Sequence, residues 1–229
     1  MEYWDQILLH HCRSQSQIQG CQIGGYCLEA YIKDTLTSQK DHNTYNFCVE
    51  IYSLLQILYW DKNIIKFEQY YQVMIKMKSE IENDYAAQII HIHFLTVSLF
   101  YQDLLNTDTS EIETSINNLP KNTGELIPDL YLNFYTTLSG IYLNRKMYSE
   151  CINIHNVYIY PFEYKSQLKV YLIQTKLQEI ICYYSLNLLD NLNSAIRSLY
   201  RMLLKEKNIS QCYQILLRFF KKNQVQIPK

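Results

Sequence analysis

The histidines and cysteines near the N-terminus are the residues whose grouping first suggests chemistry. His10, His11 and Cys12 are consecutive, and Cys21 and Cys27 follow them. A zinc ion needs ligands that converge on one point, whereas consecutive residues of a helix point in different directions. The sequence also contains no CxxC pair and no HxxxH spacing. We therefore predict that the protein has no metal site.

A nucleophile can be argued only in the loop from Gly20 to Cys27. Cys21 is near two histidines in the sequence, but a catalytic thiol needs a base beside it in space, and no GxSxG turn occurs in the chain. The string from Gly20 to Gly25 lacks the Lys-Ser or Lys-Thr ending of a phosphate-binding loop and follows no predicted strand. We predict no enzymatic activity and no cofactor. An enzyme centred on this loop ranks third among the hypotheses.

Two further histidines also fit a structural role. His91 and His93 are two residues apart, so a helix directs them to different faces. We expect partly buried imidazoles of an amphipathic helix. The carboxylates Glu111 and Glu113 lie in the first turn of a predicted helix, where they favour the positive end of the dipole.

The composition indicates which elements must position these residues. The 229 residues include only five glycines and four prolines but 22 tyrosines. Sheets and phosphate-binding loops need glycine and proline at their turns, so a chain this poor in both is best built from helices joined by short polar links. Hydrophobic residues make up 48% and charged residues 19%, which is typical of a folded protein. We predict an all-α fold.

The formal net charge of -1 gives no general attraction to nucleic acid or to an anionic membrane. Only the C-terminal part, from Arg197 onward, is clearly basic, with one acid, Glu206. Its further cations are Arg201, Lys205, Lys207, Arg218, Lys221, Lys222 and Lys229. A run of charge is usually a solvated face. Nucleic acid is therefore an unexpected partner, and a nucleic-acid-associated protein that uses these basic helices is the second-ranked hypothesis.

The expected location is the cytoplasm. The stretch from Met1 to Asp5 has two acids and no basic region, so it does not resemble a secretory signal. The most apolar segment, Ile89 to Leu105, is interrupted by polar residues and is too short to span a membrane. The seven cysteines are scattered and odd in number, which favours reduced, mostly buried thiols. We expect no membrane partner.

Apolar residues recur at three- and four-residue steps through most of the chain, and polar links interrupt them. This periodicity predicts about ten helices and no strand. Their expected ranges are Trp4–Cys12, Cys27–Thr37, Tyr45–Tyr59, Ile64–Met77, Tyr85–Leu105, Ser110–Asn118, Ile127–Leu143, Tyr148–Tyr158, Tyr164–Leu188, Leu192–Lys205 and Ser210–Lys222. Short links between amphipathic helices make them antiparallel neighbours.

The clearest interruption is Leu119–Gly124, where a proline and a glycine occur among polar residues. We predict three parts. Residues 1–42 hold N-terminal helices and the glycine-containing loop, 43–119 hold degenerate helical hairpins, and 120–229 hold clearer hairpins with a basic C-terminal helix.

The span Tyr135–Tyr158 resembles one tetratricopeptide unit. The matching positions are Tyr135, Leu138, Ser139, Tyr142, Tyr148, Cys151, His155 and Tyr158. Small residues such as Ser139 and Cys151 occupy positions where the paired helices of that family approach most closely. Tyr158 departs from the family, which usually has alanine there, and the step from Cys151 to Ala195 is longer than the usual ~34 residues.

The resemblance implies a right-handed α-α superhelix, a tetratricopeptide-like solenoid, that acts as a non-enzymatic scaffold and grips a protein or peptide on its concave face. Carried over residue by residue, the outward positions are Asn133, Thr136, Leu143, Asn144, Tyr184 and Asn187. The same residues could instead be solvated helix faces, and exposed stacking faces make self-association possible. The sequence identifies neither the partner nor the process.

Overall fold

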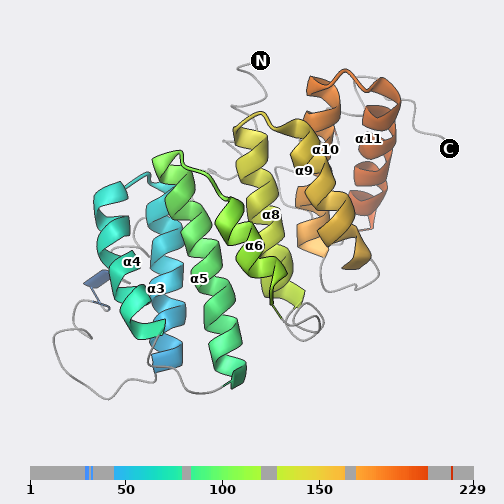
Figure 1. Ribbon diagram of the computed structural model, residues 1–229. Coiled ribbons are helices and arrows are strands. Elements are labelled where there is room, and N and C mark those ends of the chain that lie inside the picture. The colour runs from blue at the N-terminus through green and yellow to red at the C-terminus, as the bar shows by residue number, and fades with distance from the viewer. Residues whose placement is uncertain are drawn as a thin grey trace. The chain divides into compact units, whose positions relative to one another are not determined.

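The computed structural model describes residues 29–30, 32, 44–78, 84–119, 128–162, 169–205 and 218 (Figure 1). These residues form eight α-helices and no strand, which confirms the predicted all-α fold. The predicted helix Trp4–Cys12 lies outside them, and Cys27–Thr37 and Ser210–Lys222 lie almost wholly outside them. The predicted total of about ten helices therefore stays a prediction.

The chain divides into two compact units, unit 1 from Met1 to Thr123 and unit 2 from Gly124 to Lys229. The division falls inside the segment Leu119–Gly124, where the sequence has its clearest interruption. The further boundary expected near residue 42 stays a prediction. Each unit has its own core and is described by itself.

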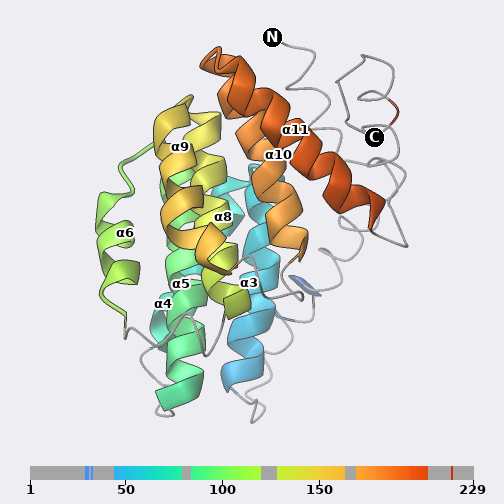
Figure 2. The ribbon, with the colours of Figure 1, turned by 90° about the vertical axis from the view of Figure 1, so that its right-hand side faces the viewer.

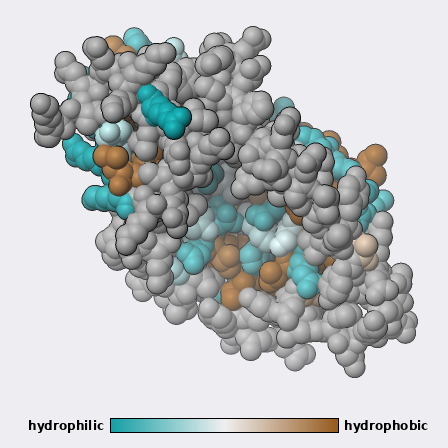
Figure 3. Space-filling model, turned by 180° about the vertical axis from the view of Figure 1, so that it is seen from behind, coloured by the Kyte–Doolittle hydropathy of each residue, from teal (hydrophilic) through white to brown (hydrophobic). Residues whose placement is uncertain are grey.

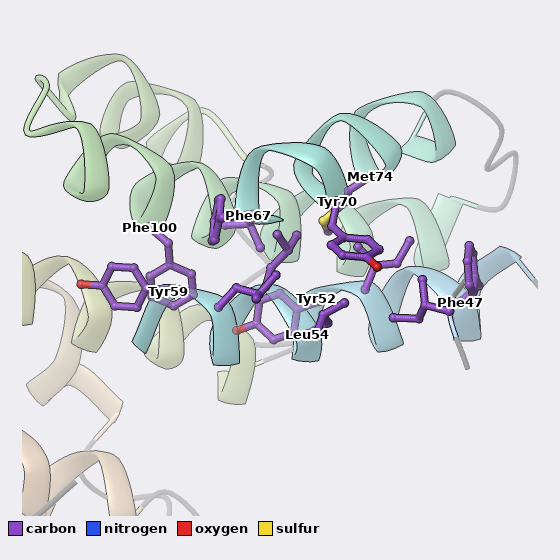
Figure 4. Close-up of a cluster of buried hydrophobic side chains, with 13 residues drawn as sticks. Phe47, Tyr52, Leu54, Tyr59, Phe67, Tyr70, Met74 and Phe100 are labelled. Carbon is purple, nitrogen blue, oxygen red and sulfur yellow. The ribbon is translucent and has the colours of Figure 1, made fainter. Parts of the chain in front are cut away.

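Unit 1 contains two hairpins. The helices α3 (Thr44–Trp60) and α4 (Ile64–Lys78) form the first, and α5 (Asp84–Leu105) and α6 (Ser110–Asn117) form the second. Helix α5 packs against both α3 and α4, so the second hairpin closes the apolar side of the first. Aromatic rings fill much of the space between the helices (Figure 4). The buried core residues are Ile32, Phe47, Ile51, Tyr52, Leu54, Leu55, Leu58, Tyr59, Phe67, Tyr70, Met74, Val97 and Phe100.

Unit 2 repeats this arrangement. The first hairpin joins α8 (Pro128–Asn144) to α9 (Tyr148–Ile154), which continues as a π-helical turn (His155–Ile159) and a 3-10 turn (Tyr160–Phe162). The second joins α10 (Lys169–Ser185) to α11 (Leu189–Leu204). Helix α10 packs against α8, α9 and α11, and Figure 2 shows it between the first hairpin and α11.

Two predicted boundaries in unit 2 are wrong. The helix expected to run to Leu188 ends at Ser185, and the one expected from Leu192 begins at Leu189. The cause is Asn187, whose φ of 56° is incompatible with a right-handed helix. Polarity alone gave no sign of this turn, because Leu186, Leu188 and Leu189 surround it with apolar residues.

Each described hairpin closes its first helix with the same backbone turn. One residue takes positive φ, and the next residue returns its N–H to the carbonyl five positions earlier. These bonds run from Asn63 to Leu58 (3.0 Å), Thr107 to Gln102 (2.9 Å), Met147 to Tyr142 (2.9 Å) and Leu188 to Tyr183 (2.8 Å). The positive-φ residue itself bonds the carbonyl three positions earlier, which completes a Schellman motif in all four turns.

The four positive-φ residues are Lys62, Asn106, Lys146 and Asn187. They follow one another at steps of 44, 40 and 41 residues, taken as the differences between their numbers. The turn recurs at a nearly constant step, which exceeds the ~34 residues of the tetratricopeptide motif. The structure therefore contains a repeat of backbone geometry that the sequence shows only weakly.

The second helices of the hairpins begin with different caps. Asn63 accepts a hydrogen bond from the Lys66 N–H to its Oδ1 at 3.2 Å, so its side chain caps α4. At the same position in unit 2, Met147 and Leu188 make no side-chain cap. In these three hairpins the second helix begins directly after the shared backbone turn, whereas α6 begins at Ser110, three residues after Thr107.

The left-handed position of Lys146 gives a direct test of this turn. Lys146→Gly should raise the free energy of unfolding by about 0.5–1 kcal/mol, because glycine has no Cβ that opposes positive φ. Lys146→Val should lower it by about 1–2 kcal/mol, since a β-branched residue fits that region worst. Urea denaturation measures both changes. Equal stabilities for the two variants would contradict the assigned conformation.

Candidate interaction surface

The six predicted partner-binding residues occupy different environments within unit 2. On α8, Asn144 is exposed, whereas Asn133 and Leu143 are half-buried. Beyond these, Tyr184 at the end of α10 and Asn187 in the following turn are exposed. The structure thus brings the exposed members to the ends of α8 and α10. Whether they bind a partner stays a prediction.

Thr136 is the exception, because the prediction that it points outward is wrong. Only 3% of its surface is exposed. Its carbonyl oxygen accepts a hydrogen bond from Gln178 Nε2 at 3.3 Å and lies 2.9 Å from Ser139 Oγ. Thr136 therefore lies on the face of α8 that packs against α10. The family pattern was fitted to α8 alone, and the packing of the next hairpin covers this position.

A buried polar cluster fixes α8, α9 and α10 relative to one another. Gln178 Oε1 accepts hydrogen bonds from Ser139 Oγ at 2.8 Å and from His155 Nε2 at 2.9 Å. These three residues come from three helical segments, and Ser139 and His155 have no exposed surface. A buried network of this kind needs each partner in one position, so it specifies how the helices meet.

Helices α8 and α10 approach each other closely beside this cluster, because α8 has a glycine there. A Cβ atom at Gly140 would lie 3.3 Å from Gln178 Nε2, tighter than ordinary packing allows. Glycine weakens a helix interior, so its presence in α8 has a cost of about 1 kcal/mol. That cost is offset by the hydrogen bonds that Gln178 reaches from this distance.

His155 is held as a neutral imidazole. Burial lowers its pKa from 6.5 to about 4, more than the nearby polar groups raise it. Because Nε2 donates to a carbonyl oxygen of Gln178, the proton lies on Nε2 and Nδ1 is the unprotonated nitrogen. Nδ1 is enclosed and has no hydrogen-bond partner. A protonated ring would leave a charge buried there, so this histidine is not suited to proton transfer at neutral pH.

The thiol of Cys151, beside this histidine, is also in an unreactive state. Cys151 Sγ lies 3.7 Å from His155 Nε2, and both residues are fully buried. A hydrogen bond with Cys182, together with burial, raises the pKa of the Cys151 thiol far above its usual value. A thiol that is both protonated and enclosed cannot attack a substrate. The predicted loop from Gly20 to Cys27 lies outside the described residues.

The positions that match the tetratricopeptide pattern in sequence include two small residues and several large rings. Ser139 and Cys151 are fully buried, as expected where helices approach closely. Tyr158, which replaces the usual alanine, stacks on Tyr135 with ring centroids 4.1 Å apart and planes 5° apart. The large ring is accommodated as an aromatic pair between α8 and the π-helical turn rather than expelled.

In unit 1, His93 and His91 lie on different faces of α5, as predicted. His93 is buried with its ring centroid 4.1 Å from that of Tyr52, whereas His91 is half-buried. Burial lowers the pKa of His93 to about 4.

Among the residues that the structure describes, no three histidine, cysteine or acidic side chains are grouped so that they could hold a metal ion. The N-terminal group from His10 to Cys27 lies outside that part.

The exposed apolar residues gather at the hairpin turns, which sequence reasoning missed. On the face drawn in Figure 3, hydrophobic and hydrophilic side chains of the described residues lie next to one another, so a single exposed leucine is ordinary. At the turn between α10 and α11, however, Tyr184, Leu186, Leu188 and Leu189 are all exposed within six residues. The sequence signal that could have indicated this exposed apolar turn is the run of apolar residues on both sides of Asn187.

The same end of unit 2 carries the turn between α8 and α9, because α8 and α10 pack side by side and both end there (Figure 1). We call this end the unit 2 tip. It consists of Asn144, Met147, Tyr184, Leu186, Asn187, Leu188 and Leu189. Tyr184 and Leu189 are 61% and 59% exposed, which is unusual for large apolar side chains in one turn. The tip includes three of the six sequence-predicted residues.

Comparison of the chain with protein-family models, with curated proteins and with solved structures gives no match. No helix in the described ranges combines the length and the apolar character that crossing a membrane requires. The arguments for function therefore rest on the geometry of the two units.

The neutral state of His155 predicts a pH effect on unit 2. The unfolded chain binds a proton near pH 6.5, but the folded unit does so only near pH 4. Between these values the unfolded state binds more protons, so the free energy of unfolding falls as the pH falls. We expect unit 2 to lose about 2 kcal/mol between pH 7 and pH 5 through this group.

Urea denaturation followed by circular dichroism at the two pH values measures the effect. His155→Gln retains hydrogen-bonding capacity and should remove the pH dependence of the free energy of unfolding of unit 2. His93→Gln, in unit 1, should leave that pH dependence unchanged. A His155→Gln variant with the full pH dependence of the original chain would disprove the role of this imidazole.

Proposed function

We propose that the protein is a non-enzymatic scaffold that binds another protein, and that its hairpins form a tetratricopeptide-like array. The observation that carries this proposal is the recurrence of one Schellman turn in four hairpins at steps of 40 to 44 residues, the differences between the positive-φ positions. Stacked hairpins bury the faces they share with neighbours and leave other residues free for partners. Such arrays serve mainly as binding surfaces.

The chemistry of the buried groups supports the same proposal. The described residues with the most perturbed pKa values, His93, Cys151 and His155, are enclosed in helix contacts. Their shifts stem from burial and from bonds between helices, as expected of structural groups. The described cysteines Cys48, Cys151 and Cys182 are buried and form no disulfide, which supports a reducing compartment such as the cytoplasm.

The proposed contact surface is the unit 2 tip. The sequence-based hypothesis places the partner on the concave face of the array, with Thr136 among the contacts. Because Thr136 is buried, the exposed residues favour the ends of α8 and α10 instead. A patch of roughly 300 Å² covered by a partner contributes on the order of 7 kcal/mol before the entropic cost of association. Asn144 and Asn187 add hydrogen-bonding groups beside it.

The partner can be found and the tip tested in one series of experiments. A photo-crosslinking amino acid at position 188 should trap a specific protein in cells, whereas one at exposed Val157, which lies in the same unit but outside the tip, should not. With the trapped protein purified, Tyr184→Ala combined with Leu189→Ser should weaken binding at least tenfold, which corresponds to about 1.4 kcal/mol. Isothermal titration calorimetry measures the affinity.

Val157→Ser is the matched control, because it also removes an exposed apolar side chain from unit 2. It should leave the affinity unchanged. Original affinity in the double tip variant, with folding verified by circular dichroism, would refute the tip as the contact surface. Equal weakening by Val157→Ser would show that the effect is not local.

A further inference from the structure

Helix α11 carries a row of cations on the side that faces away from the core of unit 2. Arg197, Arg201 and Lys205 follow one another at four-residue steps, so the helix places them on one face about 6 Å apart. Arg201 and Lys205 are exposed. On the opposite side of the helix, Ala195, Ile196, Leu199 and Leu203 are buried. In Figure 2, α11 lies in front of α10, toward the viewer.

These cations have no partners within the described part of the chain. No hydrogen bond or ion pair engages the side chains of Arg201 and Lys205 there, and Arg197 Nε is enclosed without an acceptor. Elsewhere in the described ranges two other cations have carboxylate partners. Lys176 pairs with Glu179 at 3.0 Å, and Lys66 pairs with Glu29 at 2.8 Å. The row on α11 differs because its exposed cations have no acidic partner among the described residues.

The helix dipole accounts for only part of this arrangement. Cations in the last turn of a helix are favourable, which explains Arg201 and Lys205. Arg197 is two turns from the end of α11, beyond the range of that effect. The long helices α3, α5, α8 and α10 also have no basic residue in the last turn, so compensation of the dipole is not a general device in this protein.

An apolar side chain lies among the cations. Leu204 is 59% exposed and is three residues beyond Arg201, on the same face. We call Arg197, Arg201, Leu204 and Lys205 the α11 cationic face. Its combination of charges at four-residue steps with one exposed leucine complements an amphipathic helix that has carboxylates at the same steps and an apolar residue beside them.

We propose that the α11 cationic face docks an acidic helical segment of another protein. The exposed Arg201 guanidinium and Lys205 ammonium groups bind carboxylates, Arg197 adds positive charge from a half-buried position, and Leu204 packs against an apolar side chain of the partner. This surface goes beyond the unit 2 tip, because Arg201 is twelve residues along α11 from Leu189, a distance of ~18 Å. Either surface can fail without the other.

A nucleic acid fits this face less well than an acidic protein segment. Single strands are bound by cations together with exposed aromatic rings on which bases stack. The one aromatic residue of α11, Tyr200, is half-buried. The chain as a whole has a formal net charge of -1, so it lacks the general attraction for a polyanion.

The test uses the full chain and a fluorescein-labelled synthetic peptide as the probe. The peptide is a helix of about sixteen residues with glutamate at every fourth position and leucines beside that row. We expect fluorescence anisotropy at low salt to show binding, and Arg201→Gln combined with Lys205→Gln to weaken it about fivefold, as two exposed ion pairs allow. Leu204→Ser should also weaken it.

The matched control is Lys62→Gln combined with Lys146→Gln, which removes the same charge from two other exposed positions. Its affinity for the peptide should equal that of the original chain, and a peptide of scrambled order should bind more weakly. Equal binding by the α11 variant and the original chain would overturn the proposal. Tighter binding of an oligouridylate of equal charge, lost in the α11 variant, would also overturn it by assigning the face to nucleic acid.

Discussion

The two units depend on a constraint of the backbone, the left-handed residue that closes each hairpin. A helix that ends in a Schellman motif reverses the chain within a few residues, so the next helix must return antiparallel to the first. The apolar faces of the pair then point the same way and need a third helix to cover them. Helix α5 does this in unit 1 and α10 does it in unit 2. Neither hairpin hides its apolar side alone.

Packing of the third helix determines which polar groups are buried. In unit 2 the packing of α10 against α8 and α9 buries Thr136, Ser139 and His155, together with Gln178 of α10 itself. Hydrogen bonds among these residues replace part of the water that they lose, although Thr136 Oγ1 and His155 Nδ1 have no partner, and Gly140 permits the short distance between α8 and α10. The same unit leaves Tyr184 and Leu189 exposed at the turn between α10 and α11.

Local features of this fold were predictable from the sequence, and features that depend on contacts between hairpins were not. The periodicity from residue 45 to residue 105 placed α3, α4 and α5 within a residue at each end, since each helix buries its own apolar stripe. The boundaries around Asn187 failed because leucines surround it, although asparagine itself tolerates the left-handed region better than most residues. The prediction that Thr136 points outward failed for a different reason. Its burial depends on α10, which begins more than thirty residues later in the chain.

The turns hold their shape mainly through main-chain bonds, so most of their side chains, apart from the helix-capping Asn63, are not needed to form the turn. Lysine occupies the left-handed position twice and asparagine twice, while the residue that follows is Asn63, Thr107, Met147 or Leu188. Natural variation can therefore accumulate at these loops while helix pairing is preserved. A lineage carrying this framework could acquire or exchange binding specificities by drift at its loops, with the interior of each unit left intact.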